Sequence, residues 1–264
     1  DVGKAYGFRF VEDGYCRVLQ LGFCNCSGED DTRGIISEFT DAVREDVGAY
    51  CYEMEGFPLS DLRYDVLLQY EKERDGQIIR CLDMVYRNMV QRHKEDLPYR
   101  FYLSAGKAVT SITEIYKSID SAHFFMSGRL GYGNTRVYIA DILPKFDRIM
   151  EENHPIPRET VREFERDIET MNPEGIRSIV RRLFKSLQDR EEQNYIFYFY
   201  LIRDLNNIMM SVFQRLQIHP SDMNRMEREL EEQMDNCDSV AMLQIMTERY
   251  CIDQVNKCLD GKQD

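Results

Sequence analysis

The chain has 264 residues, of which 43% are hydrophobic and 31% are charged, and its formal net charge is −13 at pH 7. This composition is typical of a globular protein with one large core or two modest ones. The acidic balance argues against a chain that itself grips a nucleic-acid backbone, since such binding needs clustered Lys and Arg. No apolar run approaches the roughly 18 residues of a membrane span and no secretory signal opens the chain, so we expect a cytoplasmic protein without a membrane partner.

The first half alternates between strand and helix patterns. An apolar segment bounded by turn residues predicts a strand over Cys16–Phe23, and apolar residues at three- and four-residue steps predict a helix over 35–47. Two further strands are expected at Ala49–Glu55 and Leu62–Tyr70. The segment Gly56–Asp61 between them contains Gly, Pro and Ser, which predicts a hairpin loop.

The pattern continues to Pro144. We expect a helix from about Asp75 to Asp96, a strand at Tyr99–Leu103, a helix from Ile112 to Ala122 and a short strand at Arg136–Ile139. This order predicts an α+β domain over 1–144, with a ferredoxin-like, mostly antiparallel sheet and helices on one face.

After Pro144 no strand pattern remains. The segment 153–157 carries two prolines and reads as a linker, so we expect a second, all-helical domain over 145–264. Asn172 followed by Pro173 and Glu174 is a helix start signal. The predicted helices are at about 158–170, 173–187, 190–217, 220–234 and 239–259.

The stretch Tyr99–Pro144 carries a family resemblance. Its small-residue turn Ser104–Ser111 and the helix motif Tyr116–Phe125 resemble the degenerate GGDEF-like domain in the middle of AraC-type response regulators and of related sugar-diacid and purine-catabolism regulators. The entry Tyr6–Phe10 is also similar. The resemblance implies a non-catalytic signalling module between a receiver and a helix-turn-helix domain, both outside this chain. The missing initiator Met agrees with a piece of a longer protein.

The same resemblance raises the question of whether the chain has diguanylate cyclase activity. Active diguanylate cyclases carry two glycines and two acids in the hairpin between the second and third strands, where backbone and metal ions hold the nucleotide phosphates. The corresponding hairpin keeps one glycine and loses the paired acids, and the acid expected on the first strand is also missing. We therefore expect no enzyme activity, no cofactor and no metal. The degenerate hairpin consists of Gly56, Phe57, Pro58, Ser60 and Asp61.

Other motifs have simple structural interpretations. Glu151-x-x-His154 has the spacing of a di-iron ligand pair but no second copy, and Gly128–Asn134 is read as a connection and not a phosphate loop. His123 is read as a packed or surface residue. The eight cysteines, including Cys24 and Cys26, fit no zinc spacing and are expected to be reduced and mainly buried.

The helical half carries the candidate interaction surface, two apolar stripes at helical spacing. They predict a bundle core, a homodimer interface, or both at once on different sides. An alternative is a small-molecule sensor, with Tyr195, Tyr198 and Phe199 lining the ligand pocket. Through domains outside the chain, the partners would be a histidine kinase and DNA. The candidate interface residues are Tyr195, Phe199, Ile202, Met209, Phe213, Val240, Leu243 and Tyr250.

Overall fold

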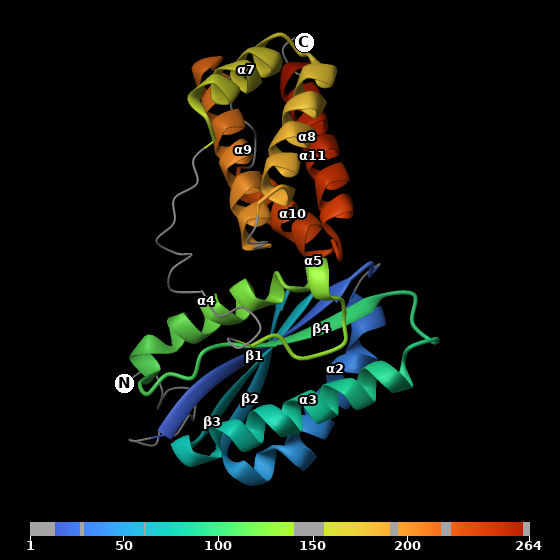
Figure 1. Ribbon diagram of the computed structural model, residues 1–264, viewed down its shortest axis with the longest axis vertical. Coiled ribbons are helices and arrows are strands. Elements are labelled where there is room, and N and C mark those ends of the chain that lie inside the picture. The colour runs from blue at the N-terminus through green and yellow to red at the C-terminus, as the bar shows by residue number, and fades with distance from the viewer. Residues whose placement is uncertain are drawn as a thin grey trace. The chain divides into compact units, whose positions relative to one another are not determined.

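The computed structural model describes residues 14–26, 29–60, 62–139, 156–190, 195–217 and 223–260 (Figure 1). The chain divides into two compact units, 1–151 and 152–264, a few residues beyond the expected boundary. The first unit combines a sheet with helices, and the described part of the second is helical. The mixed α+β class predicted from the sequence is therefore confirmed.

The first unit contains a four-stranded antiparallel sheet with the strand order β2-β3-β1-β4. β1 and β3 are central, and β2 and β4 form the two edges. In the central part of the sheet, Gln20 lies opposite Asp65 on one side and opposite Ser104 on the other. The strands are β1 (Gly14–Cys24), β2 (Cys51–Ser60), β3 (Arg63–Glu71) and β4 (Arg100–Ala105).

Helices cover both faces of this sheet, so the expectation of helices on one face was wrong (Figure 1). On one face α2 (Glu29–Asp46) and α3 (Asp75–Arg92) enclose the main apolar core. On the other face α4 (Ile115–Met126) packs against β1 and β4. The physical reason is visible in β1, which is buried almost continuously and so lacks the alternation of a half-exposed strand. The main core includes Leu19, Leu21, Phe39, Leu68, Leu82 and Leu103.

Two local predictions in this unit need correction. β2 runs through the expected hairpin loop as far as Ser60, and Pro58 is tolerated there because β2 is an edge strand. The expected strand at Arg136–Ile139 is reduced to a single parallel bridge between Tyr138 and Ser104.

The remaining elements of the first unit are short. Single 3-10 turns precede β2, α3 and α4, and a four-residue helix occupies part of the expected Gly128–Asn134 connection. They are η1 (Gly48–Tyr50), η2 (Lys72–Arg74), η3 (Ile112–Glu114) and α5 (Arg129–Tyr132).

The position of α4 on the sheet depends on small side chains. A Cβ atom on Gly106, just after β4, would lie 2.0 Å from the backbone oxygen of Ser118. The Ser118 hydroxyl accepts the backbone N–H of Val18 at 2.9 Å, and Ser121 accepts that of Lys107 at 2.7 Å. Glycine and serine thus allow the helix backbone to approach closely and satisfy backbone donors that the sheet leaves open.

The described part of the second unit is a set of packed helices in which α8 contacts α7, α9 and α11. Asn172 caps α8 by accepting the N–H of Gly175, as the start signal predicts. No described helix is both long enough and apolar enough to span a membrane. The helices are α7 (Arg158–Glu169), α8 (Pro173–Gln188), α9 (Ile196–Arg215), α10 (Met223–Asp235) and α11 (Val240–Asp260).

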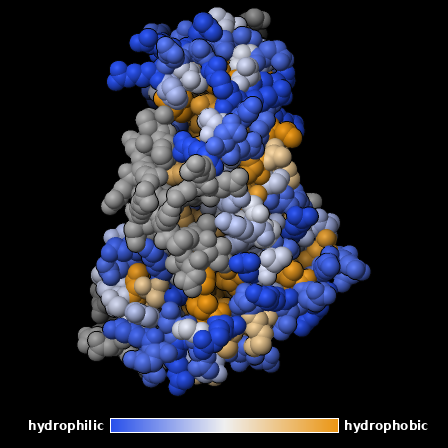
Figure 2. All heavy atoms as spheres, viewed as in Figure 1, coloured by the Kyte–Doolittle hydropathy of each residue, from blue (hydrophilic) through white to orange (hydrophobic). Residues whose placement is uncertain are grey.

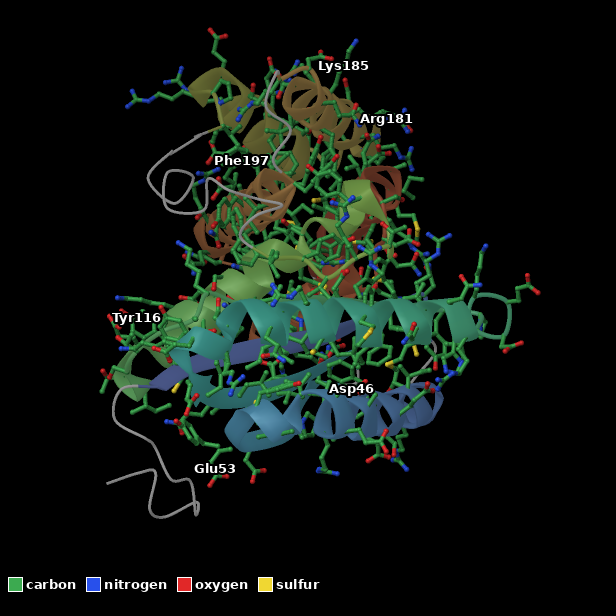
Figure 3. The ribbon with its side chains drawn as sticks, turned by 60° about the horizontal axis from the view of Figure 1, so that its bottom comes forward. Asp46, Glu53, Tyr116, Arg181, Lys185 and Phe197 are labelled. Carbon is green, nitrogen blue, oxygen red and sulfur yellow. The ribbon has the colours of Figure 1, made fainter. Side chains whose placement is uncertain are left out.

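Polar contacts hold α11 in this unit. Arg181 on α8 makes two hydrogen bonds to the carboxylate of Glu248 on α11, at 2.9 and 3.0 Å. Tyr250 donates from its hydroxyl to the side-chain oxygen of Asn206 on α9 at 3.0 Å, and both residues are buried. Figure 3 labels Arg181 on α8, together with Phe197 on α9.

Candidate functional site

A row of polar side chains crosses the sheet on the face that carries α4. Asp65 on β3, Gln20 on β1 and Ser104 on β4 are directly opposite one another in the strand register. Side chains at directly opposed positions point to the same face and lie about 5 Å apart at Cβ. We call Asp65, Gln20 and Ser104 the polar row.

The polar row is buried and incompletely hydrogen-bonded. The three residues are 1%, 2% and 0% exposed. Gln20 donates from its amide nitrogen to one Asp65 carboxylate oxygen at 3.2 Å. Within the described part of the chain, the second Asp65 oxygen, the Gln20 amide oxygen and the Ser104 hydroxyl have no hydrogen-bond partner. Buried polar groups of this kind are rare in native structures, because each costs free energy of desolvation.

Burial raises the pKa of Asp65 from its ordinary value of 3.8 to about 6, although the Gln20 hydrogen bond and the charge of Arg63 act in the opposite direction. The row therefore offers three oxygen atoms and one carboxyl group that titrates near neutrality. Each of these oxygen atoms can accept a hydrogen bond from an N–H or O–H donor. Across the described ranges, no three His, Cys, Asp or Glu side chains gather as a metal site would require.

The predicted degenerate hairpin lies at the β2 edge of the same sheet, mostly as strand. Phe57 is directly opposite Asp65, so it extends the line of the polar row to the edge, where it is partly exposed. Gly56 has a packing role, since a Cβ atom there would lie 2.1 Å from the hydroxyl of Tyr64. Pro58 and Ser60 are paired with β3, and Asp61 is outside the described residues.

The candidate interface residues of the helical half lie mainly inside it. Six of the eight are buried: Phe199, Ile202, Met209, Phe213, Leu243 and Tyr250. Tyr195 and Val240 are partly exposed. Tyr198, expected to line a ligand pocket, is also buried, and its ring packs against Phe184 with centroids 5.2 Å apart. These side chains form core packing within one copy, and whether a dimer exists stays a prediction.

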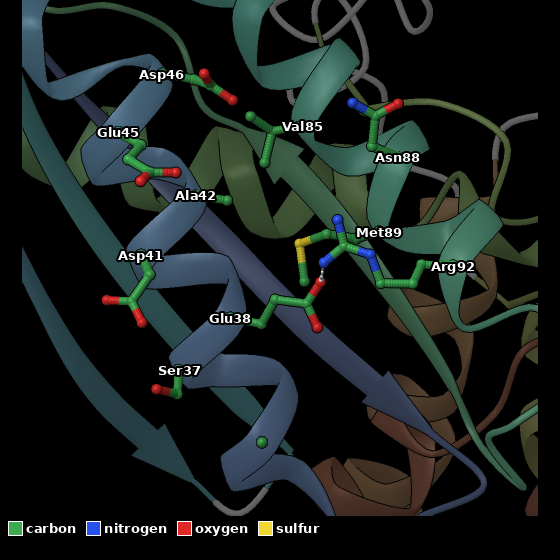
Figure 4. Close-up of a pocket in the computed structure, with 11 residues that line it drawn as sticks. Ser37, Glu38, Asp41, Ala42, Glu45, Asp46, Val85, Asn88, Met89 and Arg92 are labelled. Atoms are coloured by element: carbon green, nitrogen blue, oxygen red, sulfur yellow. Dashed lines mark hydrogen bonds and ion pairs between the residues drawn. The ribbon is translucent and has the colours of Figure 1, made fainter.

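Two surface grooves lie elsewhere. The first, about 640 Å³, lies between α2 and α3 and is lined by acids, as Figure 4 shows. Its Glu38 is bonded to Arg92 and, at 2.6 Å, to His93. The second groove, about 520 Å³, lies between α10 and α11.

The remaining motifs are the cysteines, His123 and the Glu151–His154 pair. None of the seven cysteines whose side chains the structure describes forms a disulfide, and burial raises the pKa of Cys51 to about 11 and that of Cys251 to about 12. A thiol in that state is a poor nucleophile. His123 is partly buried on α4, and Glu151 and His154 are outside the described residues.

Comparisons with known proteins return no matching family model, no matching curated protein and no matching solved structure. The site therefore has to be interpreted from its own geometry. Sequence reasoning did not identify the polar row, although a signal was present. Gln20 and Asp65 are polar residues inside largely buried strands, and a polar residue in such a strand needs a reason.

Proposed function

We propose that this chain is a non-catalytic regulatory and dimerising module of a bacterial transcriptional regulator that acts in the cytoplasm. It would connect an N-terminal receiver, controlled by a histidine kinase, to a C-terminal AraC-type DNA-binding domain, both outside this chain. The strand order β2-β3-β1-β4 and the antiparallel pairing support a ferredoxin-like, GGDEF-like sheet. The packed helices of the second unit support a role in dimerisation and linkage.

One observation carries the non-catalytic part of the proposal. At the β2 edge, where active cyclases hold their glycines and acids, this chain presents Phe57, Pro58 and Leu59 on a continuous strand. The side chains of Phe57, Pro58 and Leu59 carry no carboxylate for magnesium ions. The polar row contains a single carboxyl group, which is too little charge for a two-metal phosphate site.

Two assays test this proposal. Incubation with purine nucleoside triphosphates and magnesium should give no turnover above a no-protein blank, and any cyclic or linear dinucleotide product would contradict it. Sedimentation of the full chain at rising concentration should show a monomer–dimer equilibrium. A chain that stays monomeric at high micromolar concentration would contradict the dimerising role.

A second candidate function is the sensing of a small molecule, and the polar row favours it. Three buried oxygen atoms without partners would gain hydrogen bonds from a polyol, a sugar or an amine. A thermal-shift screen with sugars, sugar acids and nucleotides should then find a stabilising compound. Stabilisation that persists in the Asp65→Asn, Ser104→Ala double variant would place the ligand elsewhere.

A further inference from the structure

The outward face of α11 carries an apolar patch beside α10. Met242 and Ile245 are 38% and 65% exposed, and the partly buried Met246 continues the patch into the groove. On the face shown in Figure 2, hydrophilic residues dominate and hydrophobic residues form separate patches. A cluster of exposed Met and Ile next to a groove is the kind of surface that partner proteins cover.

The charges around this patch are balanced. The groove between α10 and α11 is lined by two acids, Glu229 and Asp253, and two bases, Arg249 and Lys257. Arg249 and Asp253 also pair with each other on α11 at 3.5 Å. The charged rim is therefore neutral overall, so a second copy meets no net repulsion there.

A neutral rim matters because the whole chain has a net charge of −13. Two copies of such a chain repel each other through most surfaces. The groove between α2 and α3 illustrates this, since four acids line it against the single base Arg92. Two copies that met there would place like charges together, whereas two copies that met at the α10–α11 groove would not.

We propose that the α10–α11 groove is the surface on which a second copy of this chain docks. The inference rests on the dimerising role proposed above and gives that role a location. In a two-fold arrangement the same patch serves both copies, so Ile245 of each copy enters the groove of the other. The inward face of α11, with Leu243 and Tyr250, stays in the core of its own copy. The interface is therefore formed by neighbours of the residues that the sequence pattern selects.

The test is sedimentation equilibrium of the full chain and of two single variants. Ile245→Asp places a charge at the centre of the patch and should raise the dimer dissociation constant by at least about thirtyfold, the effect of losing a hot-spot residue. Met84→Asp is the matched control. Met84 is an equally apolar, 51% exposed residue on α3 of the other unit, and its substitution should leave the constant unchanged. Circular dichroism checks that both variants keep their helices.

A charge variant adds a second, independent readout. Lys257→Glu makes the groove net acidic, so it should weaken the dimer at low salt and less so at 0.5 M salt, where charges are screened. A dimer that survives Ile245→Asp unchanged, or that weakens equally in Met84→Asp, overturns this location while the dimerising role stands. A wild-type chain that is monomeric throughout overturns the dimerising role itself, and the location with it.

Discussion

The two units differ in how completely their buried polar side chains are hydrogen-bonded. In the helical unit, Asn206 is bonded to Tyr250, and Glu248 is held by Arg181. In the α+β unit, the second carboxylate oxygen of Asp65 and the hydroxyl of Ser104 are buried without a partner. Within the described part of the chain, every buried side-chain oxygen or nitrogen without a hydrogen bond belongs to the α+β unit.

This difference affects the stability of each unit and bears on where a functional site could lie. A satisfied polar pair in a helical core fixes the geometry of the helices at little net cost. An unsatisfied row costs stability, and a protein retains such a row most readily where it serves a functional site. Under the proposed sensing function, the α+β unit would be the part that binds the ligand.

The largest effect is expected from Asp65→Asn. The pKa of Asp65 is raised from 3.8 to about 6 in the folded state, so the carboxyl is protonated in both states below about pH 4 and ionised in both above about pH 6. Ionisation is harder in the folded state, so this group lowers stability as pH rises through that window, by about 3 kcal/mol at pH 7.

Asn keeps an oxygen for the Gln20 amide but carries no charge, so the variant should be more stable at pH 7 and equally stable near pH 4. Urea unfolding at several pH values, followed by tyrosine fluorescence, measures this difference. Ser127→Ala removes another buried unpartnered oxygen without a charge, so its effect should not vary with pH. A difference between wild type and Asp65→Asn that is flat with pH would show that Asp65 is solvated.

The next effect concerns the satisfied pair of the helical unit. Tyr250→Phe leaves the buried side-chain oxygen of Asn206 without this donor, which should cost about 1–3 kcal/mol. Tyr116→Phe, at an exposed tyrosine on α4, should change stability by less than about 0.5 kcal/mol. Thermal unfolding of both variants gives the ranking. Equal effects would mean that the Tyr250 hydroxyl is replaceable by water and that the two units do not differ as described.

A smaller effect is expected for the partly exposed ion pair between Arg181 and Glu248. Burial raises the pKa of Glu248, but the hydrogen bonds from Arg181 and Gln244 outweigh it and leave the pKa lowered. Arg181→Ala should therefore speed amide hydrogen exchange in α11 by roughly tenfold at neutral pH, an effect that fades in acid as Glu248 becomes protonated.

Arg182→Ala is the neighbouring control. Arg182 pairs with Glu163, and both side chains are about half exposed, so exchange in α11 should stay as in the wild type. Equal protection in the two variants would show that the Arg181–Glu248 pair does not hold α11 in place.

The smallest effect is expected from Ser104→Ala. Removing a buried hydroxyl that has no partner should be neutral or should stabilise by up to about 1 kcal/mol. This variant sharpens the comparison because it predicts the opposite sign to Tyr250→Phe. A clear loss of stability would show that Ser104 has a hydrogen-bond partner in solution, which would weaken the case for the sensing function.

Much of the fold was predictable from the sequence, and the reasons are local. Periodic apolar residues gave the helix over 35–47, and the Asn172-Pro173 signal gave the start of α8. The extension of β2 through Gly56 and Pro58 was missed because turn-forming residues also fit an edge strand, where partner strands are lacking on one side. Nothing in the local pattern reports which strand becomes the edge.

The site was less predictable because it depends on register. Gln20, Asp65 and Ser104 are far apart in sequence, and only the pairing of three strands brings them into one row. The apolar stripes of the helical half were more predictable because they depend on local spacing. That spacing selected Leu243, which is buried, but it gave no sign that Ile245, outside the stripe, is an exposed apolar residue.

The buried thiols allow the opening rate of each unit to be measured separately in the natural chain. Alkylating reagents attack the thiolate, and burial raises the pKa of Cys16 in the sheet and of Cys251 in α11. Cys251 can therefore be modified only after α11 has detached, and Cys16 only after β1 has opened. Mass spectrometry of the labelled protein over time would give one labelling rate for Cys16 and one for Cys251, and so one opening rate for each unit.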